Sequence, residues 1–86
     1  MVQQSTIVTS ESGIHARPAA ELVNFVKNYP GTINIKNGEK SGNLKSILNV
    51  MALGIVKGTE VTIEVSGDDE ENFCTSVIDF IDNLKG

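Results

Sequence analysis

Two spacings of apolar residues recur along the chain and predict strands and helices. In residues 61–65 apolar and polar side chains alternate, which is typical of a strand with one buried face. Residues 33–35 alternate in the same way, and β-branched residues favour a first strand over 3–9. The Asn-Gly pair at 37–38 predicts a hairpin turn that returns the chain through residues 40–43. We therefore expect four short strands.

Two helices are predicted between these strands. Residues 16–27 carry Pro18 in the first turn, where its missing N–H costs nothing. Their apolar residues fall on one helical face, which consists of Ala19, Leu22, Val23 and Val26. Ser46 is a suitable N-cap for a short helix over 47–53, which Gly54 ends as a left-handed residue.

A third helix is expected after residues 67–69. Asp68 and Glu71 have the spacing of a capping box, with Asp in the place of Ser or Thr. The helix has an apolar stripe made of Phe73, Val77, Phe80 and Leu84, widened by Cys74, Ile78 and Ile81. Because Cys74 belongs to this stripe, we expect it to be inert core.

The predicted element order is β-α-β-β-α-β-α, which indicates the α+β class. Four short strands can form one antiparallel sheet with its apolar face covered by the helices, giving a two-layer sandwich with one open face. Residues 1–86 fit one small domain, too small to enclose a deep active site. Any chemistry is therefore expected at the surface.

Composition and charge exclude several classes of protein. No apolar run approaches the length of a membrane span, and the first residues show neither a basic nor an apolar region of a signal peptide. One cysteine cannot form an intrachain disulfide, so a reducing cytoplasm is expected. The net charge is −4, with an excess of bases in residues 1–58 and of acids in 59–86. The six bases scattered over residues 1–58 do not make a nucleic-acid surface, whereas an acidic protein partner or a phosphate would fit them.

His15, the only histidine, is the first candidate for chemistry. It precedes a predicted helix whose first N–H groups lack partners and carry partial positive charge, and such a position favours a bound anion. Arg17 adds a permanent cation with donors suited to phosphate oxygens. A neutral imidazole nitrogen is a nucleophile and could accept a phosphoryl group there. The competing interpretation is that His15 only caps the helix.

Ser46 and the short helix after it are further candidates. Lys45 precedes Ser46, and a phosphate on this serine would add negative charge at a helix start; ordinary N-capping is the alternative. The helix is apolar on nearly every side, so part of it should stay exposed as a docking surface, unless the outward residues are merely scattered. No paired ligand spacing predicts a metal, and no hydrolytic triad or paired carboxylates are present. We expect no metal, no cofactor and no enzyme turnover.

Taken together, these motifs resemble the HPr family, the histidine-containing phosphocarriers of the bacterial phosphoenolpyruvate-dependent sugar phosphotransferase system. The resemblance covers essentially the whole chain. It is most specific in residues 12–19 (SGIHARPA), 43–47 (NLKSI) and 50–54 (VMALG). The last two segments resemble proteins of low-GC Gram-positive bacteria more than enteric ones. The resemblance implies an open-faced sandwich with strand order 1-4-2-3.

The resemblance also implies roles and partners. His15 would receive a phosphoryl group on Nδ1 from phosphorylated Enzyme I and pass it to IIA domains of sugar permeases, with Arg17 neutralising charge. Ser46 would be the target of an ATP-dependent HPr kinase/phosphorylase, and the seryl-phosphorylated form would be a corepressor for a catabolite-control repressor. The docking face for these partners would include Ala16, Ala20, Ile47, Leu48 and Met51. A monomer is expected.

The chain departs from the family pattern at several positions. Thr6 stands where a bulkier apolar residue is expected and Ile7 where a polar one is, which leaves the facing of the first strand open. Gly38 comes one position early in the hairpin, and Gly42 replaces a β-branched residue, so the third strand is expected to be loose. Asn24 removes a positive charge that is frequent on the partner face.

Three other functions remain to be weighed against a phosphocarrier of the sugar system. One is a purely regulatory binding module acting through phosphoserine at Ser46, which His15 and Arg17 disfavour as the sole role. Another is a carrier of the nitrogen-related phosphotransferase branch. An acyl carrier protein would need Asp-Ser-Leu in an all-helical bundle, whereas this chain has Lys-Ser-Ile among strands.

Overall fold

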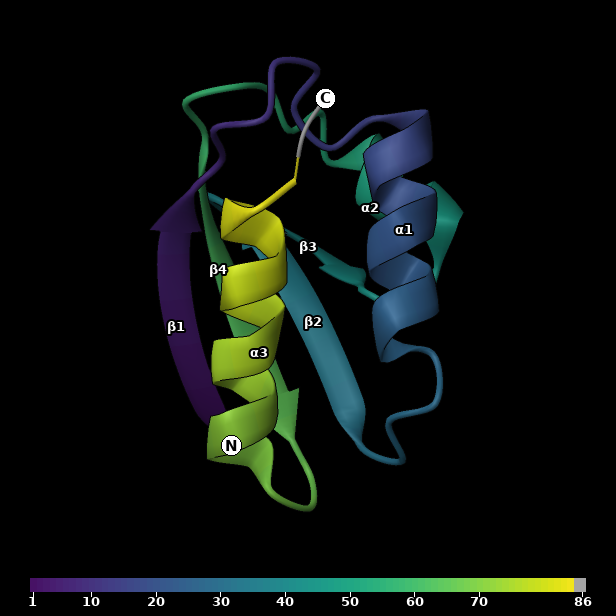
Figure 1. Cartoon of the computed structure of the whole chain (residues 1–86), viewed down its shortest axis with the longest axis vertical. Helices are drawn as coiled ribbons and strands as arrows, with labels where there is room; N and C mark the ends of the chain where they lie inside the picture. The colour runs from purple at the N-terminus through teal and green to yellow at the C-terminus, as the bar shows by residue number, and fades with distance from the viewer. Residues whose placement is uncertain (85–86) are drawn as a thin grey trace.

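A computed structural model describes residues 1–84 of the chain. Within this range four strands and three helices follow one another in the predicted order (Figure 1). Their bounds are β1 Val2–Ile7, α1 Ala16–Val26, β2 Thr32–Asn37, β3 Lys40–Asn43, α2 Ile47–Ala52, β4 Glu60–Ser66 and α3 Glu70–Asp82.

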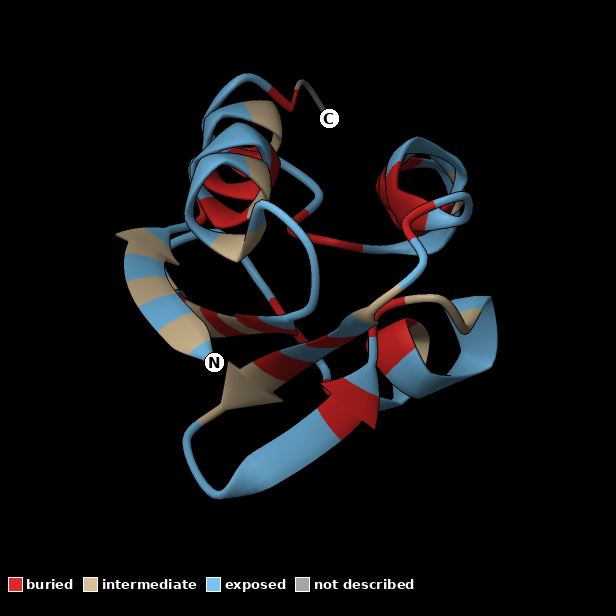
Figure 2. Ribbon diagram, turned by 90° about the horizontal axis from the view of Figure 1, so that it is seen from below, coloured by how far each residue is buried: buried red, intermediate tan, exposed pale blue. Residues whose placement is uncertain are grey.

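The strands form one antiparallel sheet in the order β1-β4-β2-β3, which confirms the expected topology. β4 lies in the centre, with Val65 paired to Val2 on one side and to Ile33 on the other. Figure 2 shows α1 and α3 above one face of the sheet and α2 beside β3, while the opposite face is open. The α+β open-faced sandwich is therefore confirmed.

The hydrophobic core lies between the sheet and the helices and matches the predicted periodicities. Alternate residues of the inner strands face inward, and all four predicted residues on the inner side of α1 are buried. Cys74 is fully buried on α3, with its Sγ 3.7 Å from the carbonyl oxygen of Ile63, as expected for inert core. The predicted bounds of α1 and α2 each hold to within one residue, and Gly54 has the expected positive φ of 62°.

The facing of β1, which the sequence left open, is settled by its side-chain contacts. Gln4 and Thr6 point toward α3, where Gln4 Nε2 donates to Thr75 Oγ1 over 2.9 Å and the Thr6 hydroxyl donates to Asp82. Ile7 lies on the open face and is exposed. The strand ends at Ile7 rather than at residue 9, although the N–H of Val8 still donates to the carbonyl oxygen of Thr59 over 2.9 Å. Polar contacts thus replace apolar packing along this edge strand.

The hairpin between β2 and β3 is shifted by one residue from the prediction. Asn37 is the last residue of β2 and pairs with Lys40, so the two turn residues are Gly38 and Glu39. Gly38 has a φ of 62° and Glu39 does not share this positive φ, as in turns that need glycine only at the first central position. The side chain of Asn37 instead donates from Nδ2 to the carbonyl oxygen of Leu53 over 2.9 Å, at the end of α2.

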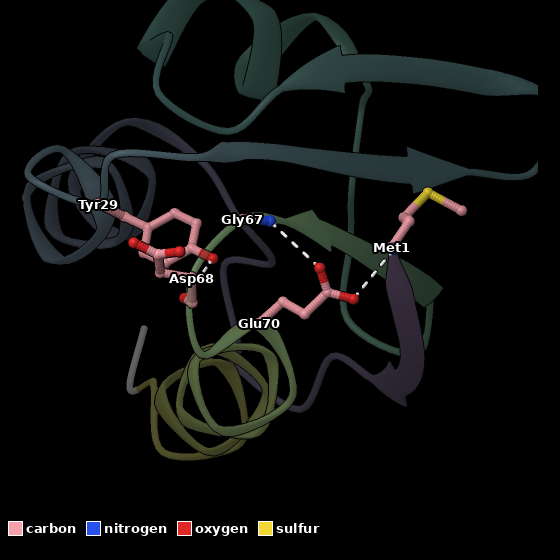
Figure 3. Close-up of polar contacts among 5 residues, drawn as sticks. All are labelled: Met1, Tyr29, Gly67, Asp68 and Glu70. Carbon is pink, nitrogen blue, oxygen red and sulfur yellow. Dashed lines mark hydrogen bonds and ion pairs between the residues drawn. The ribbon is translucent and has the colours of Figure 1, made fainter.

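The capping box predicted at the start of α3 is wrong. The N-cap is Asp69, which adopts a left-handed conformation with a φ of 53° and makes no side-chain cap hydrogen bond. Glu70 takes over the ordering of this turn (Figure 3): its Oε1 accepts from the backbone N–H of Gly67 over 3.2 Å, and its Oε2 lies 3.0 Å from the α-amino nitrogen of Met1. The turn before α3 is therefore held by Glu70, through its ion pair with the N-terminus, and not by Glu71 as the capping-box spacing predicted.

The contacts of Glu70 predict a loss of stability in acid. The hydrogen bond from the α-amino group, followed by that from Gly67, lowers the pKa of Glu70 below its ordinary value of 4.5. The contacts of the Glu70 carboxylate therefore stabilise the fold fully at pH values above the pKa that Glu70 has in the unfolded chain. This contribution is lost as the pH falls through the lower pKa that Glu70 has in the folded protein. Glu70→Gln should lower the free energy of unfolding at pH 7, and its deficit should shrink at pH 3. Thermal unfolding at both pH values measures this; Glu71→Gln, an exposed neighbour, is the control.

The aromatic side chains of the described residues form one stack between α1 and α3. The ring of Tyr29 lies 4.0 Å from that of Phe73, Phe73 lies 6.3 Å from Phe25, and Phe25 lies 4.5 Å from Phe80, with interplanar angles of 10–20°. The Tyr29 hydroxyl donates to the carbonyl oxygen of Asp68 over 2.8 Å (Figure 3). Stacked aromatic rings stabilise a fold beyond the burial of their apolar area, so this row of rings stabilises the packing of α3 against α1 and the segment that follows it.

Candidate functional site

His15 is the N-cap residue of α1, as its position in the sequence predicts. Its backbone is extended, and its carbonyl oxygen accepts from the N–H of Ala19 over 2.7 Å, the first hydrogen bond of the helix. The imidazole makes no cap hydrogen bond and is exposed. The interpretation of His15 as a simple capping side chain therefore lacks the contact that capping requires.

A tight turn holds the backbone in front of His15. The N–H of Gly13 donates to the carbonyl oxygen of Ser10 over 2.9 Å, and the N–H of Ile14 donates to Ile55 over 3.1 Å. Gly13 has a φ of 66°, and a Cβ at this position would lie 2.2 Å from the carbonyl oxygen of Ile55. Ile14 is buried. The site loop is thus anchored on both sides of a position that only glycine fits.

An exposed ion pair adds a third attachment for the same loop. Lys57 Nζ lies 2.7 Å from Glu11 Oε1. The hydrogen bond from the lysine, with its positive charge, lowers the pKa of Glu11 below its ordinary value. Because both side chains are largely exposed, the pair contributes little to stability.

Arg17 lies in the first turn of α1 and is exposed. Within residues 1–84 neither its guanidinium nor the His15 imidazole has a hydrogen bond or ion pair to another side chain. No acidic residue occupies the first turn of α1. The exposed His15 and the exposed Arg17 therefore both lie at the start of an eleven-residue helix, whose N-terminal end carries partial positive charge.

Ser46 is the N-cap of α2, which confirms that part of its prediction. Its Oγ accepts from the backbone N–H of Asn49 over 3.2 Å and also from Asn49 Nδ2 over 3.1 Å. The neighbouring Lys45 turns away, and its ammonium donates to the carbonyl oxygens of Tyr29 and Gly31. Adjacency in the sequence therefore does not place the Lys45 charge in a hydrogen bond with Ser46.

Asn49 also ties α2 to the end of β3. Its Oδ1 accepts from the backbone N–H of Asn43 over 3.2 Å, and a Cβ on Gly42 would lie 3.2 Å from the Cβ of Asn49. Gly42 is buried by this close approach. The absence of a side chain at Gly42 thus lets α2 pack directly on the strand, so the short strand is held from the side rather than left loose.

The expected docking residues lie on two adjacent helices, and most are accessible. Leu48 is 79% exposed and Ile47 is 40% exposed, whereas Val50 is fully buried, so the apolar surface of α2 is real and Ile47 is not core. Met51 and Ala20 are partly buried, and Ala16 is exposed. α1 and α2 pack against one another (Figure 1), which brings these positions into one region.

Two residues of this region were missed by the sequence analysis. Val56 is 61% exposed and lies against Gly13, so it extends the apolar surface next to the His15 loop. Ser10 is only 2% exposed, and its Oγ has no hydrogen-bond partner. The two adjacent apolar residues at 55–56 could have indicated that Val56 is exposed, because only one of two neighbouring side chains in a loop can readily be buried. No local pattern indicates the burial of Ser10.

Within residues 1–84, no group of three or more His, Cys, Asp or Glu side chains is placed to hold a metal ion. No helix in this range combines the length and the apolar character that crossing a membrane requires.

Comparisons with known proteins agree on one family. The family model of the PTS HPr component phosphorylation site matches residues 2–83. A phosphocarrier protein HPr from Mycoplasma capricolum is 46% identical over 71 residues, which cover 83% of this chain and 80% of that protein.

Solved structures of the same family have a similar fold. HPr-C-His from Thermoanaerobacter tengcongensis has a TM-score of 0.88 and 33% identity, over 94% of this chain and 91% of that one. A mycoplasmal histidine-containing phosphocarrier protein has a TM-score of 0.83 and 37% identity, over 96% of this chain and all of the other.

Proposed function

Because the chain belongs to the HPr family of phosphocarrier proteins of the phosphotransferase system, we propose that His15 is the residue that carries the phosphoryl group. The protein is a carrier rather than a catalytic enzyme. We propose that phosphorylated Enzyme I is the donor and that IIA domains of sugar permeases are the acceptors. One observation supports this most: an unpartnered, exposed imidazole lies at the start of α1, two residues before Arg17, which is also exposed.

In the transfer that we propose, Nδ1 of His15 uses its lone pair to bond to phosphorus. The bond between phosphorus and Enzyme I breaks, and its electron pair leaves with Enzyme I. The phosphoryl oxygens would then face the backbone N–H groups of Ala16 and Arg17 at the start of α1 and the guanidinium of Arg17, which together stabilise their charge. The anchored Gly13 turn keeps the imidazole in this place.

The partners would dock on the exposed apolar residues around the histidine. Ala16 and Ala20 of α1 and Ile47, Leu48 and Met51 of α2 supply this surface, and Val56 extends it. An apolar centre favours docking, and the neighbouring Arg17 favours a partner with an acidic rim. We propose that the protein acts as a monomer in the cytoplasm, so that the same face serves donor and acceptors in turn.

Ser46 is proposed as a regulatory site on the edge of this face. An ATP-dependent HPr kinase/phosphorylase would phosphorylate its hydroxyl, and the modified protein would bind a catabolite-control repressor as corepressor. Support comes from its place next to the exposed Ile47 and Leu48, where an added phosphate changes the charge of the docking surface.

Incubation with Enzyme I and phosphoenolpyruvate tests the carrier function. The intact protein should gain one phosphoryl group, detected by mass spectrometry, that is lost in acid and retained in alkali. Fragmentation should place the group on the peptide that contains His15. A protein that gains no phosphoryl group under conditions where another HPr protein is labelled would contradict the proposal.

A further inference from the structure

The hydroxyl of Ser46, the nucleophile of the proposed phosphorylation, accepts two hydrogen bonds. A serine oxygen has two lone pairs, and at Ser46 both have a donor. One donor is the backbone N–H of Asn49, at 3.2 Å, which is the ordinary N-cap hydrogen bond. The other is Asn49 Nδ2, at 3.1 Å, which an N-cap does not require.

Asn49 is itself held in place, so the second hydrogen bond is not a chance contact of a mobile side chain. Its Oδ1 accepts from the N–H of Asn43, and its Cβ packs against Gly42 of β3. With the carboxamide oxygen fixed on the strand, the carboxamide nitrogen points at Ser46. The carboxamide therefore connects β3 to the hydroxyl.

We propose that Asn49 is a positioning residue that restrains the Ser46 hydroxyl and slows its phosphorylation. This inference rests on the proposed function of Ser46. In the reaction a lone pair of Oγ forms the bond to the γ-phosphorus of ATP, the bond from that phosphorus to the β,γ-bridging oxygen breaks, and ADP leaves with the electron pair. The hydroxyl proton passes to a base of the kinase. Since both lone pairs are occupied, one hydrogen bond has to break first.

The side-chain hydrogen bond is the one that this chain can lose without losing its helix cap. A neutral hydrogen bond of this kind changes an equilibrium by about three- to ten-fold. Asn49→Ala should therefore raise kcat/KM for phosphorylation of Ser46 by about that factor. A positioning role that assists the reaction would lower the rate instead, so the direction of the change decides between the two.

The experiment compares three proteins with an ATP-dependent serine kinase active on HPr proteins. Asn49→Ala should be phosphorylated faster than wild type. Asn37→Ala is the matched control, because it removes an amide hydrogen bond from the other end of α2, that of Asn37 to Leu53, without touching Ser46. If general loosening of α2 were the cause, Asn37→Ala would be accelerated equally, and this result would overturn the inference.

A second measurement does not depend on the kinase. In nuclear magnetic resonance spectra of the unphosphorylated protein, the Nδ2 protons of Asn49 should shift and exchange faster in Ser46→Ala than in wild type. Unchanged signals would show that the hydrogen bond is absent and would overturn the inference. If the kinase phosphorylates the wild type and Asn49→Ala at the same rate, the inference about Asn49 is overturned, whereas the proposed regulatory role of Ser46 is not. Failure of the kinase to label any of these proteins would refute both.

Discussion

Replacing His15 with alanine is expected to abolish phosphoryl uptake from Enzyme I while leaving the fold intact. The loss should be complete, because the described residues contain no second histidine that could form the same acid-labile bond. The free energy of unfolding should change by no more than about 0.5 kcal/mol, since the imidazole is exposed and makes no cap hydrogen bond. Labelling with phosphoenolpyruvate and Enzyme I, together with thermal unfolding, measures both quantities.

Arg17→Ala is the companion variant, because it removes charge stabilisation and keeps the nucleophile. Its transfer rate should fall, while the phosphoryl group should still be found on His15. Acid-labile labelling that persists in His15→Ala would assign the acceptor to another residue and end the proposed mechanism.

A negative charge at Ser46 is expected to slow phosphoryl transfer to His15 by ten-fold or more. Ser46 begins the helix that exposes Ile47 and Leu48, and the Lys45 ammonium is engaged with backbone carbonyls. A charge in Ser46→Asp would therefore oppose an acidic partner, and each 1.4 kcal/mol of lost affinity is about ten-fold. The effect should fall mainly on KM in steady-state transfer from Enzyme I. Aspartate is as good an N-cap as serine, so the melting temperature should hardly change.

Two controls separate charge from helix capping in this experiment. Ser46→Ala removes the cap and should cost about 1 kcal/mol of stability, but it should transfer at nearly the wild-type rate. Ser76→Asp adds the same charge at an exposed position on α3 and should leave the transfer unchanged. Equal rates for wild type, Ser46→Asp and Ser46→Ala would mean that Ser46 is only a helix cap.

Much of the fold could be predicted because its main elements are encoded by local patterns. The inner face of α1 follows the helical spacing of its apolar residues, and the central strand follows strict alternation. α2 has a cap residue at each end, Ser46 and Gly54, so its limits were predictable although it is short. His15 could be placed at the start of α1 because Pro18 marks the first turn of that helix.

The predictions failed where distant contacts choose between equivalent local signals. Asp68 and Asp69 both suit a helix start, and the contacts of Glu70 with Gly67 and Met1 decide between them. The direction of Lys45 depends on carbonyl groups that only the folded chain brings near.

The position of Asn49 in the sequence did suggest a contact with Ser46. It stands three residues after Ser46, at the position where a capping box has Glu or Gln. In a capping box the residue at this position bonds to the N-cap backbone N–H, whereas the side chain of Asn49 bonds to the Ser46 hydroxyl and to the backbone N–H of Asn43. The spacing could therefore have indicated a contact with Ser46, but its donors and acceptors follow from the packing on β3.

The aromatic stack gives the protein a built-in optical reporter. The chain has no tryptophan, so near-ultraviolet emission comes from Tyr29, whose ring lies 4.0 Å from Phe73 of α3. Burial, followed by the nearby acidic groups, raises the pKa of the Tyr29 phenol, so tyrosinate absorbance should develop at lower pH in the unfolded chain than in the folded one. Fluorescence and absorbance of Tyr29 therefore report whether α3 is packed against the segment that follows α1, without an attached dye.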